Sequence, residues 1–165
     1  MAGIEECTRN ILVSHTKPEI QIDKTRQIIN LCCDLHWEFY PDTIMTIFSE
    51  GYRRTGGWDK LVYEKFSEVQ ELVYPDDIDI FEERIKDVVE GRRDSFDYEF
   101  RWLYKNGTYL WLNNRCLAFK DSSGKSIYFL GLTNNITEQR QKERFLQEEK
   151  KSITFENNIG FYMGI

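Results

Sequence analysis

Residues 95–137 decide the fold, and they read SFDYEFRWLYKNGTYLWLNNRCLAFKDSSGKSIYFLGLTNNIT. Three stretches rich in aromatic and aliphatic residues are separated by two polar segments, at 105–108 and 120–125. Apolar runs bounded by Gly, Asn, Asp and Ser are typical of strands joined by tight turns. We therefore expect three antiparallel strands connected by two hairpins.

The first turn contains Asn106-Gly107, a pair that tolerates the positive φ angles of a two-residue type I′ turn. Counting outward from such a loop places Trp102 opposite Trp111 on a mainly aromatic face, while the other face is mainly aliphatic. A sheet that is apolar on both faces must be covered on both, by helices, another sheet or a second subunit.

Upstream segments supply the rest of an α+β domain. Residues 35–40 and 44–49 are expected to form two strands around a turn at 41–43. Residues 58–90 are expected to form short helices on one face of a five-stranded antiparallel sheet. An earlier amphipathic helix, over residues 19–33, is expected to cover the other face or to pair with its copy in a homodimer.

Two carboxylates, Asp76 and Asp77, follow Pro75 at the start of one of these helices. We interpret them as caps for free backbone N–H groups, because neither a histidine nor a general-acid partner accompanies them. The sequence contains no nucleophile–base pair, nucleotide-binding loop or metal-ligand cluster. We therefore expect no catalytic residue and no metal site.

Composition limits the class of protein. The chain has 165 residues, of which 41% are hydrophobic and 15% aromatic, and its net charge is −6. This suits one folded domain with flanking helices, and the negative charge argues against nucleic-acid binding. No apolar run is long enough to span a bilayer or to form a signal peptide. We therefore predict a cytoplasmic protein without membrane contact from this chain, and we expect its four cysteines to be reduced thiols.

A series of short motifs resembles the PAS family, whose C-terminal half is often described as a PAC motif. The matching residues are Tyr98-Glu99-Phe100-Arg101, Asn106-Gly107, Tyr109-Leu110-Trp111, Asp121 with Gly124, Leu130-Gly131, Asn135-Ile136-Thr137-Glu138 and, upstream, Tyr74-Pro75-Asp76-Asp77. The last of these is similar to the His-Pro-Asp-Asp of one PAS subgroup. The resemblance covers roughly residues 35–150, and it departs from the family pattern at Tyr74, in place of His, and at Asn135, in place of Asp.

The resemblance implies a sensory or interaction module without catalysis, which relays a change through its C-terminal helix. Asn135, Ile136 and Thr137 would form the joint between the core and that helix. Asn135 would cap the helix, and Glu138 would complete a capping box. Asn135→Asp, which restores the family residue, is expected to tighten the joint if a basic residue such as Arg101 or Arg115 lies beside it.

The resemblance also implies a small-molecule pocket. The expected lining consists of large apolar residues, namely Phe66, Phe81, Ile85, Phe100, Trp102 and Trp111. The flavin-binding branch of the family carries Asn-Cys-Arg-Phe on a helix near the pocket, whereas this sequence has Asn114-Arg115-Cys116-Leu117 on an expected strand. We therefore expect neither flavin nor haem, and we predict no other cofactor.

The expected organisation is a flanking segment and helix at 1–34, a PAS/PAC core at 35–136, a signalling helix at 137–151, and a tail or the start of another domain at 152–165. The expected function is a sensory module of bacterial-type signal transduction, whose partner is a second copy or another signalling domain. One alternative is a fragment of a histidine kinase or of a cyclic-di-GMP synthase or hydrolase. The other is a ligand-free dimerisation domain whose core is filled by aromatic side chains.

Overall fold

The structure, a computed structural model, describes residues 27–163. The chain divides into two compact units, residues 1–33 and residues 34–165. In the first unit residues 27–32 are helical, which agrees with the end of the helix expected over 19–33. The start of that helix lies outside the described residues.

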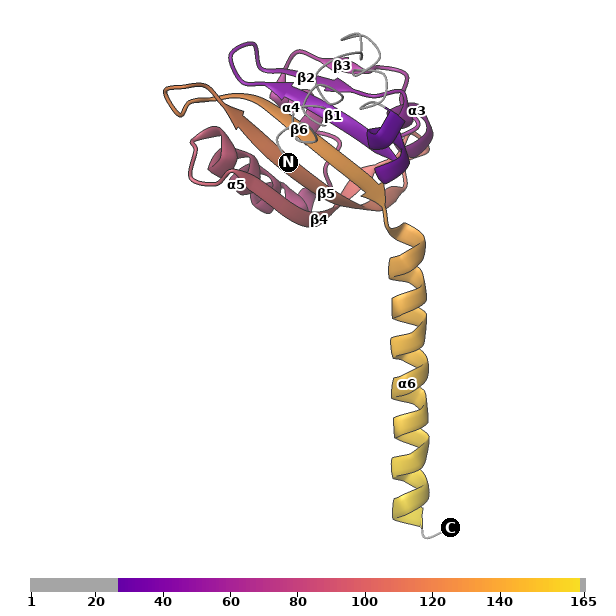
Figure 1. The fold of residues 1–165 in the computed structure, drawn as a ribbon. Helices are drawn as coiled ribbons and strands as arrows, with labels where there is room; N and C mark the ends of the chain where they lie inside the picture. Colours follow the sequence, from indigo (N-terminus) through magenta and orange to yellow (C-terminus); the bar gives the residue numbers. More distant parts are fainter. Residues whose placement is uncertain (1–26, 164–165) are drawn as a thin grey trace, which may run out of the picture. The chain divides into compact units, whose positions relative to one another are not determined.

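The second unit is built on an antiparallel sheet of six strands, in the order β3-β2-β1-β6-β5-β4 (Figure 1). The strands are β1 Leu35–Tyr40, β2 Met45–Phe48, β3 Val62–Tyr63, β4 Ser95–Leu103, β5 Tyr109–Lys120 and β6 Ser126–Asn135. The predicted α+β class and antiparallel sheet are confirmed. The prediction missed β3, because a strand of two residues is too short to show alternation.

Helices of this unit pack on one face of the sheet, which we call the inner face. They are α3 Gly51–Thr55, α4 Phe66–Gln70, η1 Pro75–Asp77 and α5 Ile78–Val89. A further helix, α6 Thr137–Met163, follows β6 and does not cover this face (Figure 1). The apolar side of α5 buries Phe81 and Val88, and α4 buries Val69, all within the core. In residues 27–163, every helix falls short of the length or the apolar character that a bilayer crossing requires.

The predicted pairing between β4 and β5 is wrong by one residue. Trp102 lies opposite Leu110, and Arg101 lies opposite Trp111. Because side chains alternate between faces, the shift puts Trp102 on the inner face and Trp111 on the other, which we call the outer face. The two tryptophans that were expected to pair therefore lie on opposite sides of the sheet.

The turn between β4 and β5 explains this shift. Gly107 adopts a positive φ of 86°, and Asn106 does not. The Gly107 N–H donates to the Tyr104 carbonyl at 2.8 Å, and the Tyr104 N–H donates to the Thr108 carbonyl at 2.8 Å. These bonds define a three-residue loop that ends in a left-handed glycine, in place of a two-residue type I′ turn. The Asn106 side-chain oxygen accepts the Thr108 N–H at 2.9 Å, which stabilises this arrangement.

A close approach between β1 and β6 shapes the inner face. Gly131 on β6 lies opposite Trp37 on β1, and the Trp37 indole lies directly over the glycine. A Cβ atom at position 131 would overlap that ring. Only glycine leaves room for the indole, so packing against Trp37 requires glycine at position 131.

Candidate functional site

A small cavity lies between the inner face of the sheet and the helices α4 and α5. Its volume is about 40 Å³. The lining residues are Leu35, Trp37, Phe39, Thr46, Phe48, Tyr52, Gly56, Phe66, Val69, Phe81, Ile85, Phe100, Trp102, Leu112, Asn114 and Thr133. The structure thus brings five of the six predicted pocket residues together, and their binding role stays a prediction. The sixth, Trp111, was wrongly placed, because the register shift moves it to the outer face.

Aromatic packing explains why the cavity is small. Phe81 stacks on Phe66 with a centroid separation of 5.7 Å and also contacts Phe100 at 5.6 Å. On the opposite side, Phe48 stacks on Tyr52 at 4.3 Å. Each aromatic side chain occupies volume that a ligand would need, so the core is largely filled by the chain itself.

Polar groups gather at one side of this apolar cavity. Asn114 on β5 is buried, and its Oδ1 accepts hydrogen bonds from Trp37 Nε1 at 2.9 Å and from Thr133 Oγ1 at 3.0 Å. These bonds connect β5 to its neighbour β6 and, across β6, to β1. The sequence prediction missed Asn114 and Thr133 as cavity residues. The available signal was a polar residue at an inward position of an otherwise apolar strand.

A second polar pair lies nearby. The Tyr52 and Tyr63 hydroxyl groups are 3.3 Å apart, and burial raises the pKa of Tyr52 well above its ordinary value. Trp102 is only 3% exposed, and its indole lies beside the Tyr52 hydroxyl, where the hydrogen bond between the two side chains lowers the pKa of Tyr52 against the larger effect of burial.

The cavity is smaller than the pockets that hold large ligands. Such pockets measure roughly 300–1,000 Å³, whereas this cavity measures about 40 Å³. Cys116 lies on the inner face of β5, and burial raises the pKa of its thiol to about 12, which disfavours thiolate chemistry. Among residues 27–163 there is no group of acidic, His and Cys side chains arranged to hold a metal ion.

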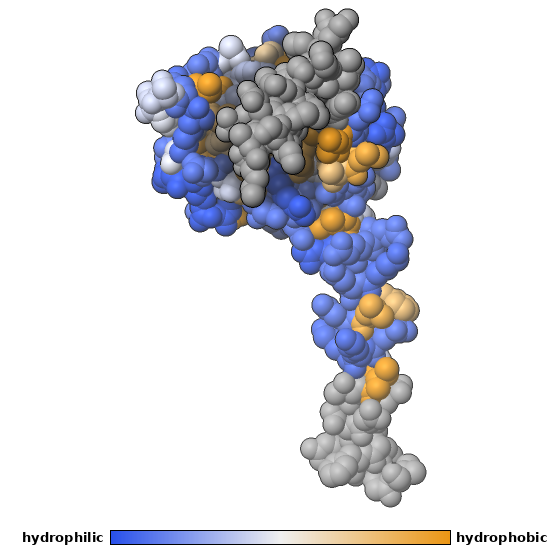
Figure 2. Space-filling view, in the orientation of Figure 1, coloured by the Kyte–Doolittle hydropathy of each residue, from blue (hydrophilic) through white to orange (hydrophobic). Residues whose placement is uncertain are grey.

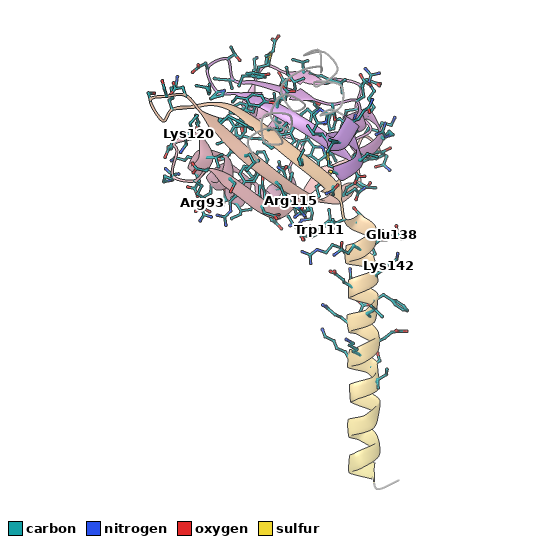
Figure 3. All side chains as sticks on the ribbon, in the orientation of Figure 1. Arg93, Trp111, Arg115, Lys120, Glu138 and Lys142 are labelled. Carbon is teal, nitrogen blue, oxygen red and sulfur yellow. The ribbon has the colours of Figure 1, made fainter. Side chains whose placement is uncertain are left out.

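The joint between β6 and α6 is fixed by hydrogen bonds to a single residue of β5. The Ile136 N–H donates to the Trp111 carbonyl at 2.9 Å, and the Trp111 N–H donates to Thr137 Oγ1 at 2.9 Å. Both backbone groups of Trp111 are therefore used by the first residues after β6. Although Trp111 was predicted as a pocket residue, the structure places it at the joint, beside the start of α6 (Figure 3).

The expected cap on α6 is present in part. Asn135 Oδ1 accepts the Thr137 N–H at 3.0 Å, as a capping side chain does. The reciprocal half of the capping box was wrong. The Asn135 N–H donates to the Asp34 carboxylate at 2.7 Å. Glu138 instead forms an ion pair with Lys142 at 2.6 Å, and both residues are labelled on α6 in Figure 3.

On the outer side of the joint, two cations contact one aromatic ring. The guanidinium groups of Arg101 and Arg140 lie over the Trp111 ring, with their Cζ atoms 5.4 and 5.2 Å from its centroid. Arg140 also forms an ion pair with Glu99 on β4. The first turn of α6 is therefore attached to both β4 and β5 through interactions of aromatic rings and charges.

Arg101 extends this attachment to the start of α5. Its guanidinium group binds both carboxylate oxygens of Asp77, at 2.9 and 2.7 Å, and Asp77 also accepts the Arg101 backbone N–H at 2.8 Å. The hydrogen bonds from the Arg101 side chain hold the pKa of Asp77 below its ordinary value. The cap predicted for Asp77 was wrong, since its side chain makes no capping bond and is committed to β4 instead.

The basic residues considered as partners for position 135 are paired elsewhere. Arg101 binds Asp77, and Arg115 lies 3.3 Å from Asp97. The carboxylate next to Asn135 is Asp34. An aspartate at position 135 would therefore face a like charge, so tightening of the joint by Asn135→Asp is no longer expected.

Beyond the joint, α6 is mainly hydrophilic, with separate apolar patches on its surface (Figure 2). Up to residue 153, where the side chains are described, its exposed large apolar residues are Phe145, Leu146 and Ile153. The helix runs without a break across residue 151, where we had expected the signalling helix to end. Between residues 137 and 153 its apolar residues are too sparse for the a and d positions of a sustained heptad pattern.

Comparison with known proteins shows what this architecture is similar to. A family model described as PAS fold matches residues 47–133. The chain is 23% identical over 91 residues to the probable diguanylate cyclase DgcE of Escherichia coli, and 25% identical over 83 residues to a methyl sulfide methyltransferase-associated sensor of Methanosarcina acetivorans. These matches cover 55% and 50% of this chain but 8% of each relative, so the chain spans a small part of the curated relatives.

Solved structures show the same fold. A sensory box histidine kinase/response regulator from Burkholderia thailandensis aligns with a TM-score of 0.64 and 20% identity, over 78% of this chain and 96% of that one. The N-terminal domain of a diguanylate cyclase with PAS/PAC sensor from Marinobacter aquaeolei aligns with a TM-score of 0.57 and 16% identity, over 64% and 97%. At these identities the likeness concerns the arrangement of strands and helices.

Proposed function

The chain belongs to the PAS fold family, and from this premise we propose that it is a sensory module of signal transduction that relays changes in its core through α6. The matched relatives include a sensor and a cyclase. By this proposal the module has no catalytic activity of its own, and an output such as a histidine kinase or a diguanylate cyclase would lie outside residues 1–165.

The joint is the observation that supports this proposal most directly. Trp111 on β5 bonds to Ile136 and Thr137 through its backbone and contacts Arg140 through its ring. On the same strand, Leu112 and Asn114 line the cavity. A shift of β5 at the cavity would thus reach the first turn of α6 within a few residues, which is the coupling that a relay requires.

We further propose that the module acts without flavin or haem, that it works in the cytoplasm, and that it pairs with a second copy or with another signalling domain. The small cavity and the raised pKa of Cys116 support the first part. The reduced thiols of Cys32 and Cys116 agree with a cytoplasmic location. The exposed apolar residues of α6 offer contacts to a partner.

A ligand-free dimerisation domain is the second candidate, and the aromatic core favours it. The close packing of Phe66, Phe81 and Phe100 leaves little space for a ligand. The two candidates differ in what the core does. A sensor changes the behaviour of α6 when the core is perturbed, whereas a structural domain holds α6 in one state.

We expect Asn135→Ala to loosen the first turn of α6 by about 0.5–2 kcal/mol, because the Thr137 N–H loses its capping acceptor. Amide hydrogen exchange should therefore accelerate at Thr137 and Arg140 while Thr133 in β6 keeps its protection. In the longer protein that carries an output domain, the variant should alter output more than it alters the stability of the core.

Asn113→Ala is the matched control, because Asn113 bonds to Asp97 on the sheet surface and does not bond to α6. It should leave exchange in α6 and the output unchanged. If Asn135→Ala behaves like Asn113→Ala in both measurements, the segment at 135–137 is only a tether and the proposed relay is wrong.

A further inference from the structure

Asp34 is the residue at which the N-terminal segment enters the sheet. It is the first residue of the second compact unit, and only Cys33 separates it from the helix at residues 27–32. The next residue, Leu35, begins β1 and pairs with Thr133 on β6. Because helix and strand are this close along the chain, a change in the direction of the helix acts on Asp34 first.

Asp34 is also bonded to the last residues of β6, which lead into α6. Its N–H lies 3.1 Å from the Thr133 carbonyl and 3.1 Å from Asn134 Oδ1. Its carboxylate accepts the Asn135 N–H at 2.7 Å. One residue therefore connects the end of the N-terminal segment to the beginning of the C-terminal helix.

The Asp34 carboxylate supplies a negative charge at the start of α6. Asn135 caps this helix through its neutral amide, which accepts the Thr137 N–H, and it stands where the PAS pattern has an aspartate. The acidic residue of the first turn, Glu138, is paired with Lys142. Since anions are stabilising at a helix N-terminus, the charge that favours this helix start comes in part from Asp34, on the N-terminal side of the module.

The backbone of Asp34 is closely packed, and the route through it avoids the cavity. A Cβ atom at position 51, the first residue of α3, would overlap the Asp34 carbonyl oxygen, so that Gly51 lies directly against it. Close packing transmits a displacement that a looser contact would absorb. Neither Asp34 nor Asn135 lines the cavity, so a movement at residue 34 reaches α6 without passing through the core.

We propose that Asp34 is a positioning residue through which the helix at residues 27–32 controls the first turn of α6, as a second input that bypasses the cavity. The inference rests on the proposed relay through α6 and adds a second source for the change that is relayed. While the helix holds Asp34 in place, its carboxylate keeps the Asn135 N–H and the first turn is ordered. When the helix is disturbed, this bond opens and the first turn loosens.

Leu31→Pro in the complete chain tests this input. Leu31 is 87% exposed, so the substitution interrupts the helix without removing a core contact. We expect amide hydrogen exchange at Asn135 and Arg140 to accelerate about fivefold. The indole N–H signals of Trp37 and Trp102, which line the cavity, should keep their positions. Leu31→Ala is the matched control, because it removes the same side chain and retains the helix, and it should leave the exchange unchanged.

Variants of Asp34 itself isolate the link. Asp34→Ala removes the acceptor of the Asn135 N–H and should accelerate exchange at Arg140, and Leu31→Pro should then add less than about twofold. The double variant Asp34→Ala/Asn135→Asp returns a carboxylate to the start of α6 with no like charge beside it. It should restore slow exchange at Arg140, and that exchange should no longer respond to Leu31→Pro.

Three results would overturn the proposal. Leu31→Pro and Leu31→Ala could give the same exchange in α6, Leu31→Pro could keep its full effect without Asp34, or the Trp37 and Trp102 signals could move together with the change in α6. The last result would mean that the input passes through the core. Asn135→Ala retains the backbone N–H that bonds to Asp34, so its outcome tests the relay separately from this second input.

Discussion

Asp77→Ala is expected to lower the free energy of unfolding of the domain by about 3 kcal/mol, a large effect for a partly exposed residue. The Asp77 carboxylate accepts three hydrogen bonds from Arg101, one of them from the backbone of β4. Only 15% of the Asp77 side chain and 27% of the Arg101 side chain are exposed. Removing the carboxylate leaves a partly buried cation and a backbone N–H unpaired, which is costlier than the loss of an exposed ion pair.

Denaturant unfolding of the two proteins measures this loss. Asp76→Ala is the matched control, because its carboxylate is 77% exposed and lies 3.9 Å from Arg101. That substitution should change the free energy of unfolding by less than about 0.5 kcal/mol. Equal effects of the two substitutions would mean that the contacts of Asp77 with Arg101 contribute nothing specific to stability.

The same ion pair predicts a dependence of stability on pH. Arg101 holds the pKa of Asp77 in the folded chain below its ordinary value of 3.8. The stabilisation is therefore fully present above that ordinary value, and it is lost as the pH falls through the lower folded-state pKa. Asp77→Asn has no carboxylate to gain a proton at this position, so its stability should fall less steeply than that of the wild type below about pH 4. Identical slopes in acid unfolding experiments would contradict this expectation.

The Asp77–Arg101 pair could be predicted from the sequence only in part. A helix start at Pro75 was predictable from proline and acidic residues, and the helix is present. The partner of Asp77 was not predictable, because Arg101 lies 24 residues away and belongs to a strand whose distance from η1 depends on the tertiary fold. Local capping rules cannot compare a nearby backbone donor with a remote guanidinium group.

The two hairpins were predictable because Asn, Gly, Asp and Ser punctuate apolar runs. The register of the first hairpin was not, because Asn106-Gly107 fits both a two-residue and a three-residue loop. A difference of one residue in the loop reverses the face of each side chain on β5. Because of this ambiguity, Trp111 was predicted to line the pocket although it lies at the joint. For the same reason, Asn114 was not predicted to line the cavity although it does.

The helical part of the cavity lining was predicted well for a physical reason. Phe81 and Ile85 recur at the spacing of one helix face, and this face is insensitive to the register of the sheet. Phe100 and Trp102 lie on β4 at alternate positions and share a face in any register. The polar members of the lining escaped prediction, since Asn114 and Thr133 read as solvent-facing residues until the sheet is paired.

Gly131→Ala is expected to have a comparably large effect, about 3 kcal/mol of lost stability, because the new methyl group would occupy the volume of the Trp37 indole. Interiors are packed too closely for such an overlap to be absorbed without movement. The indole would have to turn away from Asn114 and lose the 2.9 Å hydrogen bond that joins β1 to β5. Denaturant unfolding gives the loss, and the Trp37 indole N–H signal reports whether the bond to Asn114 survives.

The cause can be isolated by repeating the substitution in a Trp37→Leu background. Leucine lacks the ring that overlaps position 131, so Gly131→Ala should destabilise that background by less than about 1 kcal/mol. The difference between the two backgrounds is the interaction between the methyl group and the indole. If Gly131→Ala is equally harmful with leucine at position 37, the strand requires glycine for its backbone instead. The choice of glycine at position 131 would then be unrelated to the Trp37 indole. It would also have no effect on Asn114, which this indole positions at the cavity on β5, the strand that holds the first turn of α6.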